Sequence, residues 1–138
     1  MRRLLLLLTA LAAACGGADP GGPLPAPPAL DTSTMEPLVA ETLSAARAAV
    51  VEEPANGRRW SDLGLALDAH FFLEEAEACL AVAIELDPTL FDATYDHAVL
   101  GTMLEREVDE VVARFVSAAA LRDDYPPVHA RLGDFLLV

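Results

Sequence analysis

Residues 60–88 constrain the fold of this chain more than any other stretch. Trp60, Leu63 and Leu67 recur at intervals of three and four residues, which places them on one face of a helix. A second stripe with helical spacing follows, formed by Ala76, Leu80, Ala83 and Ile84. Asp87-Pro88 ends this second helix, because proline cannot continue a helix and restricts the residue before it. The stretch therefore predicts two short amphipathic helices packed as an antiparallel pair.

The same spacing recurs on both sides of this stretch. Pro54 and Pro88 lie 34 residues apart, and Leu132-Gly133 follows Leu63-Gly64 by 69 residues, one interval of 34 and one of 35. We place the extra residue near Arg106-Glu107, in a turn between two helices. The pattern predicts a half repeat over residues 34–56, full repeats over 57–90 and 91–125, and a partial repeat over 126–138. A capping box of Ser33 and Glu36 is expected to start the first helix.

The spacing resembles the tetratricopeptide repeat, a 34-residue helix–turn–helix unit that stacks into solenoids. The matching slots are Trp60, Leu63, Gly64, Ala76, Ala83 and Pro88. Leu67 and Leu80 stand where the family usually has aromatic residues. The resemblance implies an all-α fold, a short solenoid of antiparallel helix pairs with about six helices. Core packing alone also explains each of these residues.

Residues 1–14 have the features of an export signal. Arg2 and Arg3 precede an apolar run that is too short to span a membrane, and small residues follow it. The junction before Cys15 resembles a bacterial lipobox, although Ala12 stands where that motif most often has leucine. The resemblance implies that Cys15 is lipidated, with Gly16 after it favouring an outer-membrane anchor that faces the periplasm. The alternative is an ordinary secretory signal cut near Ala14.

Composition divides the remainder into a linker and one domain. Residues 15–30 are rich in Gly, Pro and Ala and are expected to form a semi-extended linker that buries nothing. Residues 31–138 form the predicted helical domain. The whole chain has 22 acidic and nine basic residues, a formal net charge of −13. Because phosphate backbones repel such a chain, we expect no nucleic-acid partner.

No catalytic or metal-binding pattern stands out. His70, His97 and His129 lack the spacing of metal-binding pairs, so we expect no metal, no cofactor and no enzymatic activity. His97 occupies a slot that holds leucine in the neighbouring copies, and we expect a hydrogen-bonded core histidine there. Cys79 is expected to be a small buried residue.

The family resemblance also implies a binding face. Where such repeats bind peptides, they use the concave face made by the first helix of each pair. The corresponding positions here are Arg58, Ser61, Leu65, Asp68, Asp92, Tyr95, Val99, Thr102, Ala130 and Asp134. Their mixture of apolar and acidic side chains suggests an apolar and basic partner, with Tyr95 as its anchor. The alternative is that this face is merely solvated.

These observations favour a membrane-anchored protein–protein interaction scaffold in the bacterial cell envelope. Two alternatives stay open: an accessory segment of a larger envelope enzyme or assembly, and a fragment of a longer repeat protein. The apolar residues 135–138 leave self-association through that end as a further expectation.

Overall fold

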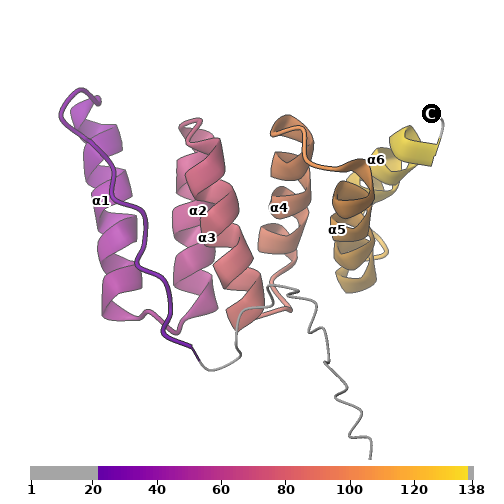
Figure 1. Ribbon diagram of the computed structural model, residues 1–138, viewed down its shortest axis with the longest axis horizontal. Helices are drawn as coiled ribbons and strands as arrows, with labels where there is room; N and C mark the ends of the chain where they lie inside the picture. Colours follow the sequence, from indigo (N-terminus) through magenta and orange to yellow (C-terminus); the bar gives the residue numbers. More distant parts are fainter. Residues whose placement is uncertain (1–21, 137–138) are drawn as a thin grey trace, which may run out of the picture.

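The computed structural model describes residues 22–136, and within this range the chain is all-α, without strands. The helices are α1 (Pro37–Glu52), α2 (Gly57–Ala69), α3 (Leu73–Leu86), α4 (Phe91–Met103), α5 (Val108–Leu121) and α6 (Pro126–Leu136). They stand in a row, and consecutive helices run in opposite directions (Figure 1). The predicted signal peptide and Cys15 lie outside the described residues.

The helix boundaries repeat with the spacing predicted from the sequence. Helices α2 and α4 begin 34 residues apart, at Gly57 and Phe91, and α6 begins 35 residues later, at Pro126. The turn between α2 and α3 spans residues 70–72, whereas the turn between α4 and α5 spans 104–107. Each turn holds one left-handed residue, Phe71 with φ 63° and Glu105 with φ 53°. The all-α fold of six helices and the position of the extra residue are thus confirmed.

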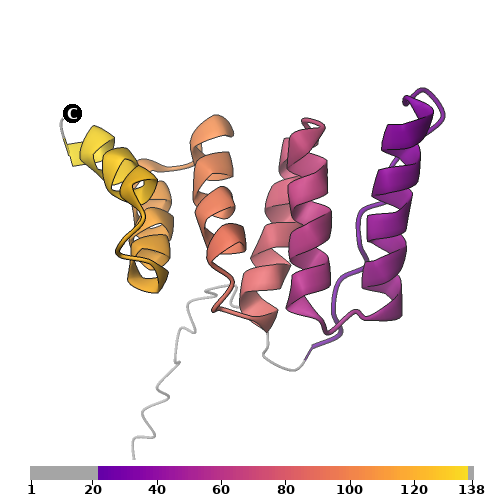
Figure 2. The ribbon, with the colours of Figure 1, turned by 180° about the vertical axis from the view of Figure 1, so that it is seen from behind.

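Packing is mainly between helices that are adjacent in sequence, with an additional contact between α2 and α4. In Figure 1, α3 and α5 lie in front of α2 and α6, and this order is reversed in the view from behind in Figure 2. The row is therefore two helices deep along much of its length. None of the described helices is long and apolar enough to cross a membrane.

Trp60 anchors the larger of two apolar clusters. Its side chain is 1% exposed, and its indole Nε1 donates a 2.8 Å hydrogen bond to the carbonyl of Pro54, as a buried indole N–H requires. Gly64 allows α2 and α3 to approach closely, because a Cβ there would lie 2.7 Å from Cδ2 of Leu80. The smaller cluster joins α4, α5 and α6 through Ala98, Val111 and Phe115, with Leu132 and Phe135 against it.

The segment before α1 differs from the prediction of a linker that buries nothing. Residues 22–36 run alongside α1 (Figures 1 and 2), and Leu30 packs against the cluster that contains Leu43. Nε of Arg47 donates a 2.9 Å hydrogen bond to the carbonyl of Pro28. The prediction was wrong for Pro27, Pro28 and Leu30, which are half-buried because an extended Pro-rich segment can cover the apolar flank of α1, whereas residues 22–26 and Ala29 are exposed as expected.

The start of α1 also differs from the expected capping box. The helix begins at Pro37, and the carboxylate of Glu36 accepts hydrogen bonds from the backbone N–H groups of Leu38 and Val39. Ser33 instead donates its backbone N–H to Asp31. Glu36 acts as the N-cap because an anion there complements the free N–H groups and the positive end of the helix dipole.

Candidate partner-binding face

Most of the predicted site residues lie on α2 and α4, which contact each other directly. Leu65, Asp68, Tyr95 and Val99 are half-buried, whereas Arg58, Asp92, Thr102, Ala130 and Asp134 are exposed. We call Leu65, Asp68, Asp92, Tyr95, Asp96 and Val99 the α2–α4 face. Helix α6 packs chiefly against α5. The fold therefore brings the α2 and α4 residues onto neighbouring helices, while Ala130 and Asp134 lie on the last described helix.

Ser61 is a correction to the predicted site. Its side chain is fully buried, so it cannot contact a partner, and its hydroxyl has no hydrogen-bond partner within the described residues. The residue spacing places Ser61 on the correct helix, but it does not show how deeply the side chain is buried. At the corresponding slot of the next pair, the much larger Tyr95 reaches solvent and stays half-buried.

Three aspartates give the α2–α4 face its charge. Burial, together with the charges of Asp68 and Asp92, raises the pKa of Asp96 to about 6. Burial also raises the pKa of Asp68. Among the described residues, none of the three forms an ion pair. A carboxylate that is partly desolvated beside like charges is an unfavourable arrangement that a cation would relieve.

Tyr95 belongs to an aromatic group at the end of this face. Its ring stacks on Phe91 with centroids 5.9 Å apart, and it meets Tyr125 edge-on at 5.4 Å and Phe115 at 6.1 Å. Such offset and edge-on pairs are the geometries that aromatic rings prefer. The packing fixes the ring position, which favours the predicted use of Tyr95 as an anchor, since little side-chain entropy is left to lose on binding.

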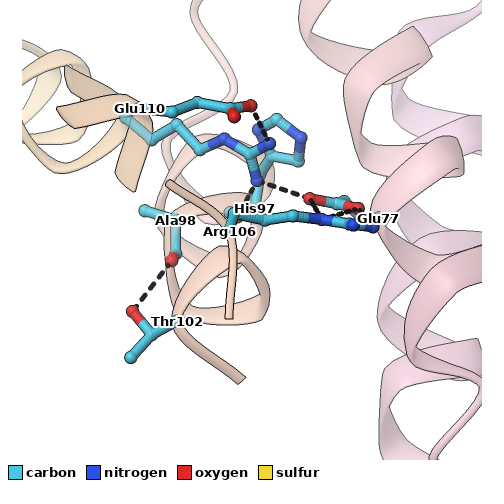
Figure 3. A network of polar contacts seen from close by, with 7 residues as sticks. Glu77, His97, Ala98, Thr102, Arg106 and Glu110 are labelled. Atoms are coloured by element: carbon cyan, nitrogen blue, oxygen red, sulfur yellow. Dashed lines mark hydrogen bonds and ion pairs between the residues drawn. The ribbon is translucent and has the colours of Figure 1, made fainter. Parts of the chain in front are cut away.

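A network of arginine and glutamate side chains crosses from α3 to α5 (Figure 3). Glu77 on α3 accepts hydrogen bonds from Nη2 of Arg106 and Nη1 of Arg114, each at 2.7 Å. Arg114 also donates to the carbonyl of His97 at 3.0 Å and pairs with Glu110. The side chains of Glu77 and Arg114 are only 12% and 13% exposed. The network holds the two helix pairs at one relative position.

The Glu77 network escaped the sequence analysis, although the repeat register contains a signal for it. The positions equivalent to Glu77 are Leu43 and Val112, so a charge stands where the other copies have an aliphatic residue. Burial alone pushes the pKa of Glu77 up, but the hydrogen bonds and charges of Arg106 and Arg114 outweigh it and lower the pKa below its usual value. Arg106 lies in the turn that has the extra residue.

His97 and Cys79 are both placed in the packed part of the fold. His97 is half-buried; burial lowers its pKa to about 4, and the charge of Arg114 contributes. Its backbone carbonyl accepts a hydrogen bond from Arg114. Its ring forms no hydrogen bond with another described residue, so the prediction of a hydrogen-bonded histidine ring was wrong. Cys79 is fully buried, as predicted, and burial raises its pKa to about 12.

The comparisons with known proteins give no family for the chain. No protein-family model matches it, and no curated protein matches it either. Within residues 22–136, no three His, Cys, Asp or Glu side chains lie together in a way that could hold a metal ion.

Proposed function

We propose that this chain is a lipid-anchored, tetratricopeptide-repeat scaffold of the bacterial cell envelope, facing the periplasm. It binds a protein segment with apolar and basic side chains on the α2–α4 face. One observation carries the proposal: the half-buried side chains of Leu65, Tyr95 and Val99 share the α2–α4 face with three aspartates. None of these aspartates has an ion-pair partner among the described residues. Apolar contacts would supply affinity, and the acidic side chains would orient the partner and speed its association.

The aspartates favour a basic partner over a neutral one. The raised pKa of Asp96 means that its ionised form is disfavoured in the free protein. A lysine or arginine placed beside Asp96 and Asp68 would stabilise the ionised form, so the partner gains an ion pair without breaking an existing one. The acidic chain as a whole would attract the same partner over longer distances, and the rate of association should therefore fall with salt.

A binding role is also favoured over a catalytic one by the state of the two side chains best suited to chemistry. The buried Cys79 thiol has a strongly raised pKa, which disfavours the nucleophilic thiolate. The His97 ring has a pKa of about 4 and a half-buried position, far from the value near neutrality that suits a general base. We infer that the scaffold acts by holding a partner.

Crosslinking in intact cells tests the binding face. The Tyr95→Ala, Val99→Asp double variant should lose most of the partners that the unmodified protein recovers, because it removes the anchor and places a charge in the apolar part. Val116→Asp on α5 is the matched control, since Val116 is 53% exposed. Circular dichroism should show that both variants keep their helices. Equal recovery of the same partners by the double variant and the parent would exclude this face.

The lipid anchor needs a separate test, because Cys15 lies outside the described residues. Cys15→Ser should move the protein from the membrane fraction to the soluble fraction. The substitution removes the proposed site of acylation, and stable anchoring requires several acyl chains. Mass spectrometry of the parent should find acyl groups on Cys15. A parent without acyl mass and a variant that still fractionates with membranes would show that the anchor assignment is wrong.

A further inference from the structure

An arginine side chain lies against two aromatic rings where α5 ends and α6 begins. The guanidinium carbon of Arg122 lies 4.9 Å from the centroid of Phe91 and 5.1 Å from that of Tyr125. The two ring centroids are 5.1 Å apart, with an angle of 78° between the ring planes. The three groups thus form a nearly equilateral triangle, in which two perpendicular rings make a corner around one cation.

Tyr95 extends this corner along α4. Its ring is nearly parallel to Phe91, at 15°, and nearly perpendicular to Tyr125, at 85°. Tyr95 therefore stacks on Phe91, and Tyr125 stands nearly perpendicular to both rings, while the ring contacts of Arg122 are with Phe91 and Tyr125. We call Phe91, Tyr95 and Tyr125 the aromatic corner. Ring faces arranged in this way attract cations through their quadrupoles, and several rings around one cation are the usual receptor for cationic groups.

The aromatic corner is accessible, and its present cation is weakly held. All three rings are half-buried, and the Arg122 side chain is 47% exposed. The other described partner of Arg122 is Asp124, at a long 3.5 Å and with a side chain that is 77% exposed. Such an exposed pair contributes little to holding an arginine in place. Arg122 can therefore leave the rings without uncovering a buried charge.

We propose that the aromatic corner is a receptor for a guanidinium group of the partner, and that Arg122 occupies it in the free protein. This inference deepens the proposed function, because it assigns one basic side chain of the partner to an arginine and places it beside the predicted anchor Tyr95. Arginine suits the corner better than lysine, since a planar guanidinium stacks on ring faces and is more weakly hydrated than an ammonium group.

Occupation by Arg122 makes a quantitative prediction. An internal cation competes with an added one, so the apparent affinity of an added guanidinium falls by the fraction of molecules in which the corner is free. For a cation–π contact at an exposed site, that fraction corresponds to a reduction of roughly three- to sixfold. Removing the Arg122 guanidinium should therefore raise the affinity for an external arginine by roughly the same factor.

The experiment is a nuclear magnetic resonance titration of the full chain with a blocked Gly-Arg-Gly peptide, observing the ring protons of Tyr95 and Tyr125. The same peptide with citrulline in place of arginine is the control, because citrulline has a similar shape without the charge. The arginine peptide should shift both sets of ring signals, and the citrulline peptide should leave them in place. Arg122→Ala should bind the arginine peptide roughly three- to sixfold more tightly.

Two further variants keep the test decisive. Arg131→Ala removes an exposed arginine of α6 and should bind the peptide as the parent does. If Arg122→Ala does not fold, Arg122→Gln removes the charge while keeping most of the side chain. Phe91→Leu should abolish the ring shifts, because leucine retains an apolar contact but has no ring face. Circular dichroism of each variant should match the parent.

Several outcomes would overturn the inference. Unchanged or weaker binding by folded Arg122→Ala or Arg122→Gln would show that Arg122 does not occupy the receptor. Equal shifts with the citrulline peptide would show that charge is not recognised, and full binding by Phe91→Leu would place the peptide elsewhere. The proposed function can fail independently, through equal crosslinking by the Tyr95, Val99 double variant, while the isolated chain still binds arginine in this titration.

Discussion

The two complete helix pairs share one register but are held together by different chemistry. In the α2–α3 pair, Gly64 faces Leu80 so closely that a Cβ would require a shift. In the α4–α5 pair, Ala98 is the equivalent of Gly64. The nearby Gly101 leaves room for the guanidinium of Arg114, because a Cβ at position 101 would lie only 2.9 Å from Nη1 of Arg114. The first pair is closed by aliphatic packing, and the second accommodates an arginine.

This difference shows that the repeat register fixes where helices lie but not what joins them. Arg114 reaches from α5 to Glu77 of the first pair, so the second pair is attached to the first by charges as well as by apolar contacts. A buried ion pair often contributes little net stability over an aliphatic contact, but it is directional and tolerates few alternative arrangements. The network therefore supports a defined orientation of α4 against α2, and with it the geometry of the α2–α4 face.

The largest expected effect comes from breaking this connection. Glu77→Ala should lower the free energy of unfolding by about 3 kcal/mol, because it leaves the poorly exposed Arg114 without its buried partner. Glu110→Ala is the matched control: it pairs with the same arginine, but its side chain is 53% exposed, so its loss should cost less than about 1 kcal/mol. Urea denaturation measures both, and equal losses would show that the burial of Glu77 has no energetic role.

The next effect tests whether the two pairs are equivalent at their tightest position. Ala83 and Ala118 lie 35 residues apart and are both fully buried. Replacing either by leucine should overpack the site and cost about 1–3 kcal/mol of stability. Thermal unfolding of the two variants gives the comparison. An unchanged melting temperature for Ala83→Leu would contradict the register, whereas a loss only for Ala83→Leu would show that the second pair is more loosely packed.

Substitutions of two equivalent glycines, one in the first helix pair and one in the last helix, should change stability by smaller amounts and in opposite directions. Gly64 and Gly133 occupy equivalent slots, but a Cβ at Gly133 would meet no atom within 4 Å among the described residues. Gly133→Ala should stabilise the protein by up to about 1 kcal/mol, through helix propensity alone. Gly64→Ala should destabilise it by about 1 kcal/mol, since the clash with buried Leu80 exceeds the same gain. Chemical denaturation that gives the same sign for both would contradict the close approach at Gly64.

The register explains which parts of this structure were predictable from the sequence. Apolar periodicity and the 34- and 35-residue intervals located all six helices, and the extra residue in the turn before α5, because these features depend on local geometry. Burial of Ser61 was missed because neighbouring helices, rather than local spacing, decide the depth of a position. Packing of Leu30 was missed for a related reason: a Pro-rich segment has no periodicity that reveals the surface it covers.

The polar contacts were the least predictable part. The Glu77 network joins residues 29 and 37 positions apart, and only the comparison of Glu77 with Leu43 and Val112 hints at it. The contact of Arg122 with Phe91 and Tyr125 depends on how the α5–α6 turn folds back onto α4. The sequence could single out Tyr95 as a candidate because it is an aromatic residue at a predicted binding-face position, whereas the aromatic group around it became visible only in the structure.

The last comparison, with an effect no larger than those at the two glycines, concerns Asp96 and the matching Asp62 of the first pair. Asp96 is half-buried and has a pKa of about 6 in the folded protein, against an ordinary value of 3.8, whereas Asp62 is exposed. A raised carboxyl pKa means that the folded state binds the proton more tightly than the unfolded state. Its contribution to stability is therefore present below pH 3.8 and is lost as the pH rises to about 6.

Asp96→Asn should remove that loss, because the amide has no charge to desolvate. At pH 7 the variant should be more stable than the parent by roughly 1 kcal/mol, after allowance for the partial exposure of the carboxylate. The difference should shrink toward zero near pH 4, and Asp62→Asn should differ little from the parent at any pH. Urea denaturation between pH 4 and pH 8 measures both curves. A constant difference across this range would mean that desolvation of Asp96 is not its source. A stabilised Asp96→Asn that also recovers fewer crosslinked partners would show that this carboxylate is retained for binding at the expense of stability.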